Sequence, residues 1–149
     1  MDILFDEKGY LKSKEPLEMD WAIFEETFVF NDHRRDIFNQ YIEFLEILRG
    51  MPVGNFHQWI NGSFTTLKPL PKDIDFVSFV DSVFYRRFEK RLQNLSKEFK
   101  FHSVDAYFEP VFPSNHFMSA ATRYNEADWQ HLYGRDRQFR KKGFVKIKF

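Results

Sequence analysis

The segment 61–77 constrains the fold of this chain more than any other part of the sequence. It lies between two short apolar runs and starts with a turn-forming pair, Gly62-Ser63. A loop that two prolines interrupt follows, and the segment closes with Asp73 and Asp75 on either side of an isoleucine. This order predicts a strand, a tight turn, a loop and a second strand whose first residues carry two carboxylates.

Asp73 and Asp75 are the first candidate site residues. Residues two apart in a strand point to the same face, so the two carboxylates are expected side by side. Two ionised carboxylates at that separation repel each other, and a divalent cation between them removes the repulsion. An isolated Asp-x-Asp at the start of a strand is more often a turn or a solvated strand end. The metal interpretation therefore depends on two further features, the Gly62-Ser63 pair and a third carboxylate, Asp105.

Gly62 and Ser63 are candidates for binding phosphate. A glycine lets backbone N–H groups approach a ligand closely, and such groups together with a serine hydroxyl suit phosphate oxygens. The loop that follows adds a hydroxyl and two cations as further phosphate-binding candidates, namely Thr65, Lys68 and Lys72.

A Gly-Ser pair followed after a short gap by Asp-x-Asp on a strand resembles the signature of the nucleotidyltransferase superfamily, which includes DNA polymerase beta and the minimal bacterial nucleotidyltransferases. The superfamily pattern implies a third carboxylate on a later strand between apolar residues, and Asp105 supplies it. This resemblance covers about residues 56–108. Outside it, the opening 5–11 and the late segment 132–145 are similar to small bacterial nucleotidyltransferase-like proteins.

The resemblance implies Mg²⁺-dependent (or Mn²⁺-dependent) transfer of an NMP group from an NTP to a hydroxyl of a protein, an RNA or a small molecule. Asp73 and Asp75 would hold one ion on the triphosphate, and Asp105 would join them at a second ion or act as the general base. Gly62 and Ser63 would bind the β- and γ-phosphates. The resemblance also implies a place in a toxin–antitoxin or defence module, with a cognate protein partner.

One departure from the superfamily pattern supports an alternative function. Members often carry a basic residue soon after the Gly-Ser pair, whereas this chain has Phe64, Thr65 and Thr66 there. A non-catalytic module of the same fold, binding a partner protein or a nucleotide without turnover, is therefore the second hypothesis. The small size of the chain also favours it, because there is little room for a separate acceptor-binding domain.

The C-terminal segment 135–149 carries seven basic residues against Asp136 alone. Such a segment can steer a nucleotide, an RNA or an acidic partner, or it can simply protect an exposed strand edge. RNA binding through this segment is a third, weaker hypothesis because no aromatic platform for single strands accompanies it. Trp129 and Tyr133 could stack on a nucleobase, but aromatics on a short amphipathic helix more often belong to the core.

Size and composition indicate one cytoplasmic domain. The 149 residues fit a single nucleotidyltransferase-like domain over 1–149, with its core in about 31–108 and a hairpin and a helix–strand unit added at the two ends. The absence of cysteine excludes disulfides and thiolate metal sites. We expect no membrane association, since the sequence shows neither a signal pattern nor an apolar run of spanning length.

The periodicity predicts an α/β (α+β) fold in which a mixed sheet carries helices mainly on one face. The clearest helix starts at Asn31 or Asp32 and ends at Gly50, and a second long helix follows its cap at Asp81. The remaining expected elements are a hairpin over 3–11, a short helix over 21–26, core strands over 56–61, 74–80 and 102–108, a loop from Pro110 to Pro113, a weak helix or loop over 114–124, a helix over 125–133 capped by Asn125, and an edge strand over 144–149.

Overall fold

The computed structural model describes residues 4–13 and 15–149 of the chain. Its elements, in chain order, are β1 (Leu17–Glu18), α1 (Trp21–Phe28), α2 (Asp32–Arg49), β2 (His57–Asn61), the 3₁₀ turn η1 (Ser63–Thr65), β3 (Ile74–Asp81), α3 (Ser82–Lys100), β4 (Val104–Val111), α4 (Ser119–Tyr133) and β5 (Val145–Lys148).

The strands form one mixed sheet in the order β1-β5-β2-β3-β4. β3 pairs antiparallel with β2 and parallel with β4, so it lies between the two strands that flank the site. The register places Asp75 of β3 opposite Asn61 on one side and Asp105 on the other. Pairing alone therefore brings three polar residues into one row across three strands.

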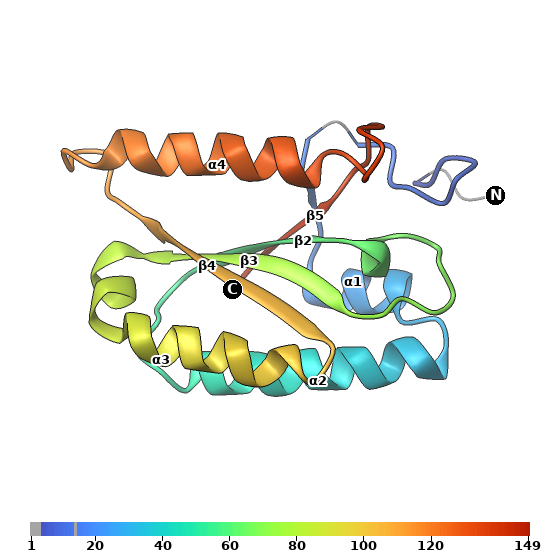
Figure 1. Cartoon of the computed structure of the whole chain (residues 1–149), viewed down its shortest axis with the longest axis horizontal. Helices are drawn as coiled ribbons and strands as arrows, with labels where there is room; N and C mark the ends of the chain where they lie inside the picture. The colour runs from blue at the N-terminus through green and yellow to red at the C-terminus, as the bar shows by residue number, and fades with distance from the viewer. Residues whose placement is uncertain (1–3, 14) are drawn as a thin grey trace.

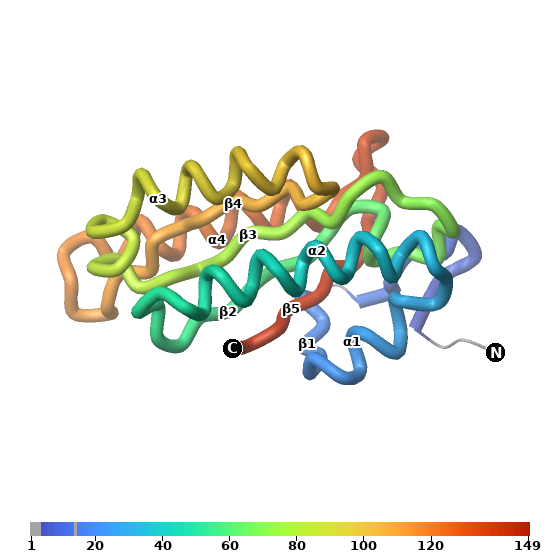
Figure 2. The backbone as a smooth tube through the Cα atoms, turned by 90° about the horizontal axis from the view of Figure 1, so that it is seen from below, coloured from blue at the N-terminus to red at the C-terminus, as the bar shows by residue number. Residues whose placement is uncertain are grey.

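Helices cover the two faces of the sheet unequally. Figures 1 and 2 show α2 and α3 side by side along one face, with α4 alone on the other. The aromatic side chains of α1 and α2 join Phe64 and Phe76 in one large core cluster on the α2–α3 face. A smaller cluster on the α4 face contains Trp59, Val77, Phe79, Tyr133 and Phe144. The expected α/β class, a mixed sheet with helices mainly on one face, is confirmed.

Local sequence signals account for the two long helices. The side chain of Asn31 accepts a hydrogen bond from the Arg34 N–H at the start of α2, and Gly50 follows its last residue. The Asp81 side chain accepts hydrogen bonds from the N–H groups of Val83 and Phe84 at the start of α3. Both helices begin where the sequence predicts them.

The second half of the chain departs from expectation in three places. α4 is one helix from Ser119, so Asn125 lies inside it, where its side-chain amide donates to Glu109 of β4. β4 runs through Pro110 to Val111, because an edge strand tolerates a residue without an N–H. β5 is not an edge strand, since the two-residue strand β1 pairs parallel with its outer side.

The N-terminal hairpin is present as a turn rather than as paired strands. Phe5 and Leu11 form an isolated antiparallel bridge, and the part of the predicted hairpin at residue 3 lies outside the described residues. A further bridge from Tyr10 to Thr66 attaches this turn to the loop that follows η1. In the described part of the chain, none of the helices combines the length and the apolar character that crossing a membrane requires.

Candidate functional site

The three predicted carboxylates meet at the start of β3 and β4, on the face of the sheet that α4 covers. Asp73 immediately precedes β3, while Asp75 and Asp105 occupy paired positions on β3 and β4. One carboxylate oxygen from each of the three lies within 4.8 Å of the others. Oxygen atoms at this spacing can share a divalent cation such as Mg²⁺ or Mn²⁺, which prefers carboxylate ligands.

Partial burial and the charges of neighbouring carboxylates raise the pKa values of Asp73 and Asp75. The pKa of Asp75 rises to about 7, first because it is buried and then because Asp73 and Asp105 lie beside it. Burial, followed by the charge of Asp105, also raises the pKa of Asp73. Among the residues that the structure describes, no lysine or arginine forms an ion pair with any of the three. A divalent cation would supply the compensating charge that the side chains here do not.

Gly62 is required by the position of the Asp75 carboxylate. Its φ is +80°, and a Cβ atom built on it would lie 2.2 Å from Oδ2 of Asp75. A side chain at this position would therefore push the carboxylate away from its neighbours. The sequence assigned Gly62 to the phosphates, and the structure adds this constraint from the carboxylate side.

The loop after Gly62 is held from below by Arg34, which is fully buried. Its guanidinium makes six hydrogen bonds to main-chain carbonyl oxygens and none to a carboxylate within the described residues. The accepting carbonyls are those of Phe28, Ser63, Phe64, Thr66 and Lys68, at 2.6–3.2 Å. Its neighbour Arg35 instead forms an ion pair with Glu25 at 2.7 Å.

The fixed loop separates the predicted phosphate-binding residues into two groups. Ser63, Lys68 and Lys72 line the cavity that also contains the three carboxylates. Thr65 is fully buried, and its hydroxyl donates to the carbonyl oxygen of Gly62 at 3.2 Å. Thr65 therefore supports the turn from beneath and does not belong to the cavity lining.

The cavity measures about 1410 Å³ and is closed on one side by residues from both ends of the chain. The N-terminal turn contributes Lys8 and Tyr10, and the segment after α4 contributes four further cations. These four are Arg135, Arg137, Arg140 and Lys142. Burial lowers the pKa of Lys142, whereas the negative charge of Asp75 counteracts that shift.

These cations change the reading of the Gly-Ser loop. The three positions after the Gly-Ser pair carry no basic residue, and the C-terminal segment brings four cations to the same cavity. The sequence signal for it was the run of basic residues in 135–149, which composition alone could not assign to a site. The structure brings that run and the three carboxylates into one cavity.

Two buried polar atoms at the cavity wall point to a ligand. Oδ1 of Asn61 and the hydroxyl of Tyr133 are buried, and neither has a hydrogen-bond partner among the described residues. A buried polar atom without a partner costs free energy, so native proteins seldom leave one without a reason. Burial, and then the nearby charge of Asp75, raises the pKa of Tyr133, so the group is a hydroxyl donor at neutral pH.

Trp129, the other aromatic considered for base stacking, packs against β4. Its indole N–H donates to Glu109 at 3.0 Å, and its ring contacts Tyr107 and Tyr133. Trp129 is not part of the cavity lining. The core interpretation of this aromatic therefore agrees with its contacts.

Comparison with known proteins gives a single result. A family model described as a family of unknown function (DUF6932) matches residues 3–148. No curated protein and no solved structure matches the chain. Because the family model spans nearly the whole sequence, the chain belongs to this family of unknown function (DUF6932).

Proposed function

We propose that this chain is a Mg²⁺-dependent nucleotidyltransferase that moves an NMP group from an NTP to a hydroxyl of a protein, an RNA or a small molecule. The observation that carries the proposal is the convergence of Asp73, Asp75 and Asp105 within 4.8 Å, in the same cavity as Gly62-Ser63. The orphaned polar atoms of Asn61 and Tyr133 on the wall of that cavity support a bound ligand independently of the carboxylates.

The donor set fits Mg²⁺ or Mn²⁺, because all three side chains offer carboxylate oxygens. Asp73 and Asp75 would hold an ion on the triphosphate, and Asp105 would complete the set for a second ion. When bound, such ions stabilise the charge of the reacting phosphoryl group and lower the pKa of the acceptor hydroxyl.

The remaining roles follow from the charges of the chain itself. The acceptor oxygen attacks the α-phosphorus, a P–O bond forms, and the bond to the bridging oxygen breaks to release pyrophosphate. Asp105, which lies on the edge strand β4, can alternatively accept the hydroxyl proton. The main-chain N–H groups and hydroxyl at Ser63, with Lys68 and Lys72, oppose the charge that develops on the pyrophosphate.

A non-catalytic module remains the second candidate, favoured by one observation. Within η1 and the loop after it, the first positions that the superfamily often fills with a base are Phe64 and Thr65, and both are buried. The alternative requires a nucleotide or a partner to bind without turnover. Asp75→Ala would then leave partner affinity intact, whereas the enzyme would lose a metal ligand.

Calorimetric titration of each NTP in the presence of Mg²⁺ or Mn²⁺ tests the proposal. We expect metal-dependent binding by the wild type and a loss of at least about 10–100-fold in Asp73→Ala or Asp75→Ala, because outer-shell changes alone typically cost that much. Asp128→Ala, an exposed carboxylate on α4, is the matched control. Radiolabelled transfer to candidate acceptors then separates the enzyme from the binding module. No metal-dependent NTP binding by folded wild type would refute the enzyme and the nucleotide-binding module, and would leave a module that binds a partner protein.

A further inference from the structure

A hairpin between α4 and β5 forms part of the cavity wall. Arg135 and Lys141 form its bridge, and the N–H of Asp136 donates to the carbonyl of Arg140 at 2.9 Å. The Asp136 carboxylate organises the turn, because it accepts from the N–H groups of Gln138 and Arg140 and from Nε of Arg140. Three bonds to one carboxylate give this short hairpin a defined shape.

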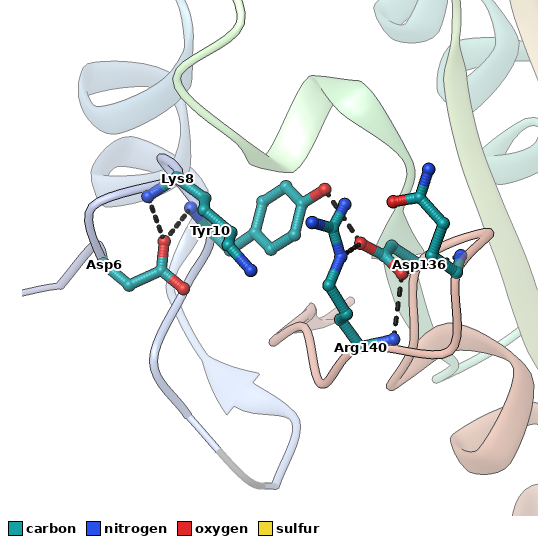
Figure 3. Close-up of polar contacts among 6 residues, drawn as sticks. Asp6, Lys8, Tyr10, Asp136 and Arg140 are labelled. Atoms are coloured by element: carbon teal, nitrogen blue, oxygen red, sulfur yellow. Dashed lines mark hydrogen bonds and ion pairs between the residues drawn. The ribbon is translucent and has the colours of Figure 1, made fainter.

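The hairpin is also attached to the N-terminal turn across the cavity wall. The hydroxyl of Tyr10 donates to Oδ2 of Asp136 at 3.2 Å, as Figure 3 shows. Asp6 fixes the position of Tyr10 by accepting hydrogen bonds from the N–H groups of Lys8 and Tyr10. Two segments from opposite ends of the chain therefore build one connected lip beside the carboxylates.

Phe139 projects from this hairpin in an unfavourable backbone conformation. Its side chain is 78% exposed and its φ is +61°, a region that bulky residues rarely adopt. Phe139 lines the cavity together with Leu132, which is also exposed. A large aromatic ring held in water by an ordered turn, at a strained position, indicates a functional role for its exposed face.

Resting on the nucleotidyltransferase function proposed above, we propose that Phe139 forms the face on which the nucleobase of the NTP stacks, with Leu132 as a second exposed apolar side chain in the same cavity lining. One cavity is lined by this ring, by Arg137 and Arg140, and by the three carboxylates. A nucleotide matches that combination of groups, since its base is apolar-faced and its phosphates are anionic.

The proposal also predicts a substrate class. A phenylalanine ring offers stacking area but no hydrogen-bonding atom, so it discriminates by ring size and not by the edge of the base. Purine nucleotides should therefore bind more tightly than pyrimidine nucleotides, with little distinction between ATP and GTP through this residue.

Binding of ATP is compared with binding of inorganic tripolyphosphate, both with Mg²⁺, in wild type and Phe139→Ala. We expect Phe139→Ala to weaken ATP binding by about 5–150-fold, the range measured for loss of one stacked base, and to leave tripolyphosphate binding unchanged. Phe101→Ala is the matched control, because Phe101 is 90% exposed at the end of α3 and outside the cavity lining. Phe139→Trp should retain ATP affinity and report stacking by fluorescence quenching.

The outcomes separate the two proposals. Equal ATP affinity in wild type and Phe139→Ala, with metal-dependent binding intact, overturns base stacking and leaves the nucleotidyltransferase function standing. Equal loss of ATP and tripolyphosphate binding in Phe139→Ala also overturns it, because the residue would then act on the phosphate site. Failure of wild type to bind either ligand overturns both proposals. Since Phe139 is exposed, the variant should keep the wild-type circular dichroism spectrum.

Discussion

The buried Arg34 and the three aspartates both lie near the loop that follows Gly62, but they differ in how many hydrogen bonds the protein gives them. Below the loop, the buried Arg34 guanidinium donates six hydrogen bonds to main-chain carbonyls. Above it, the three aspartates receive within the described residues only one side-chain hydrogen bond from another residue type, a long one of 3.4 Å from Tyr107 to Asp105. The cation is satisfied by the protein, whereas the anions are not.

The contrast distinguishes a structural charge from a functional one. A buried charge is tolerated when dipoles surround it, and Arg34 achieves this with carbonyl groups that would otherwise need partners themselves. Without a cation, burial and the neighbouring carboxylate charges raise the pKa values of Asp73 and Asp75, and the cluster gains nothing for stability. Such an arrangement is typical of sites where stability is given up for binding or catalysis.

The largest loss in the free energy of unfolding is expected from Arg34→Met. The substitution removes the guanidinium donor from five carbonyl oxygens of the loop and of Phe28, of which that of Ser63 still accepts from the N–H and the hydroxyl of Thr66. We therefore expect a loss of about 3–5 kcal/mol in the free energy of unfolding or failure to fold. Chemical denaturation measures it. Arg35→Met is the control, because the ion pair of Arg35 with Glu25 is exposed and should contribute about 0–1 kcal/mol. Equal denaturation midpoints for the two variants would contradict a structural role for Arg34.

Gly62→Ala tests the turn that lies between the buried Arg34 and the three carboxylates. The Gly62 backbone, with φ +80° and ψ −167°, lies in a region that is essentially restricted to glycine, so an alanine there should cost about 1–3 kcal/mol. The contact with Asp75 adds to this cost by displacing the carboxylate. Gly54→Ala is a matched control, since Gly54 also has a positive φ, +68°, but a Cβ there meets nothing within 4 Å. We expect denaturation to show the larger loss for Gly62→Ala, and calorimetry to show lost Mg²⁺-dependent ATP binding in that variant alone. In an Asp75→Ala background the difference in stability between the two glycine variants should largely disappear.

Sequence reasoning was sufficient wherever the signal was local. Asn31 and Asp81 predict the starts of α2 and α3, because an N-cap side chain accepts hydrogen bonds from N–H groups only two or three residues away. Asp73 and Asp75 could be placed together because residues two apart in a strand share a face, whereas only the resemblance to the nucleotidyltransferase superfamily joined Asp105 to them. The helix caps and the Asp73–Asp75 pair needed no knowledge of distant contacts.

Sequence reasoning failed where contacts between distant segments decide the structure. The residues near Asn125 in the sequence do not predict that its side-chain amide donates to Glu109. Asn125 makes this contact from inside α4, not as the N-cap of a helix. The basic run near the C-terminus could have faced solvent, and contacts with the distant N-terminal segment place it at the cavity. Among them, the Tyr10 hydroxyl donates to Asp136 and the Gly143 N–H donates to the Leu11 carbonyl. The sequence also could not predict the carbonyl groups that Arg34 binds, because those of the loop lie about 30 residues away along the chain.

The raised pKa of Asp75 predicts that the free energy of unfolding depends on pH when a chelator keeps metal ions away. A carboxyl whose folded pKa is raised stabilises the folded state fully below its unfolded pKa, and that contribution is lost as pH rises through the folded pKa. For Asp75 the window runs from 3.8 to about 7, so its contribution to unfolding free energy should fall across that interval. Asp75→Asn should flatten the profile and raise the thermal midpoint at pH 8. Mg²⁺ should raise the midpoint of the wild type but not of Asp75→Asn; an equal rise in both would argue against the metal site.

The smallest change in the free energy of unfolding is expected at Phe139, where stability should rise while ATP affinity falls. Phe139→Gly relieves a left-handed conformation that costs about 1–2 kcal/mol, while the greater entropy of glycine in the unfolded chain offsets about 0.5–1 kcal/mol of that gain. A net rise of about 0.5 kcal/mol follows, together with weaker ATP binding. Ser103→Gly is the matched control, since Ser103 also has a φ of +60° but does not line the cavity. It should gain stability and keep its ATP affinity. Lost stability in Phe139→Gly would show that its ring packs in the folded protein, and then its exposed face could not be reserved for a nucleobase.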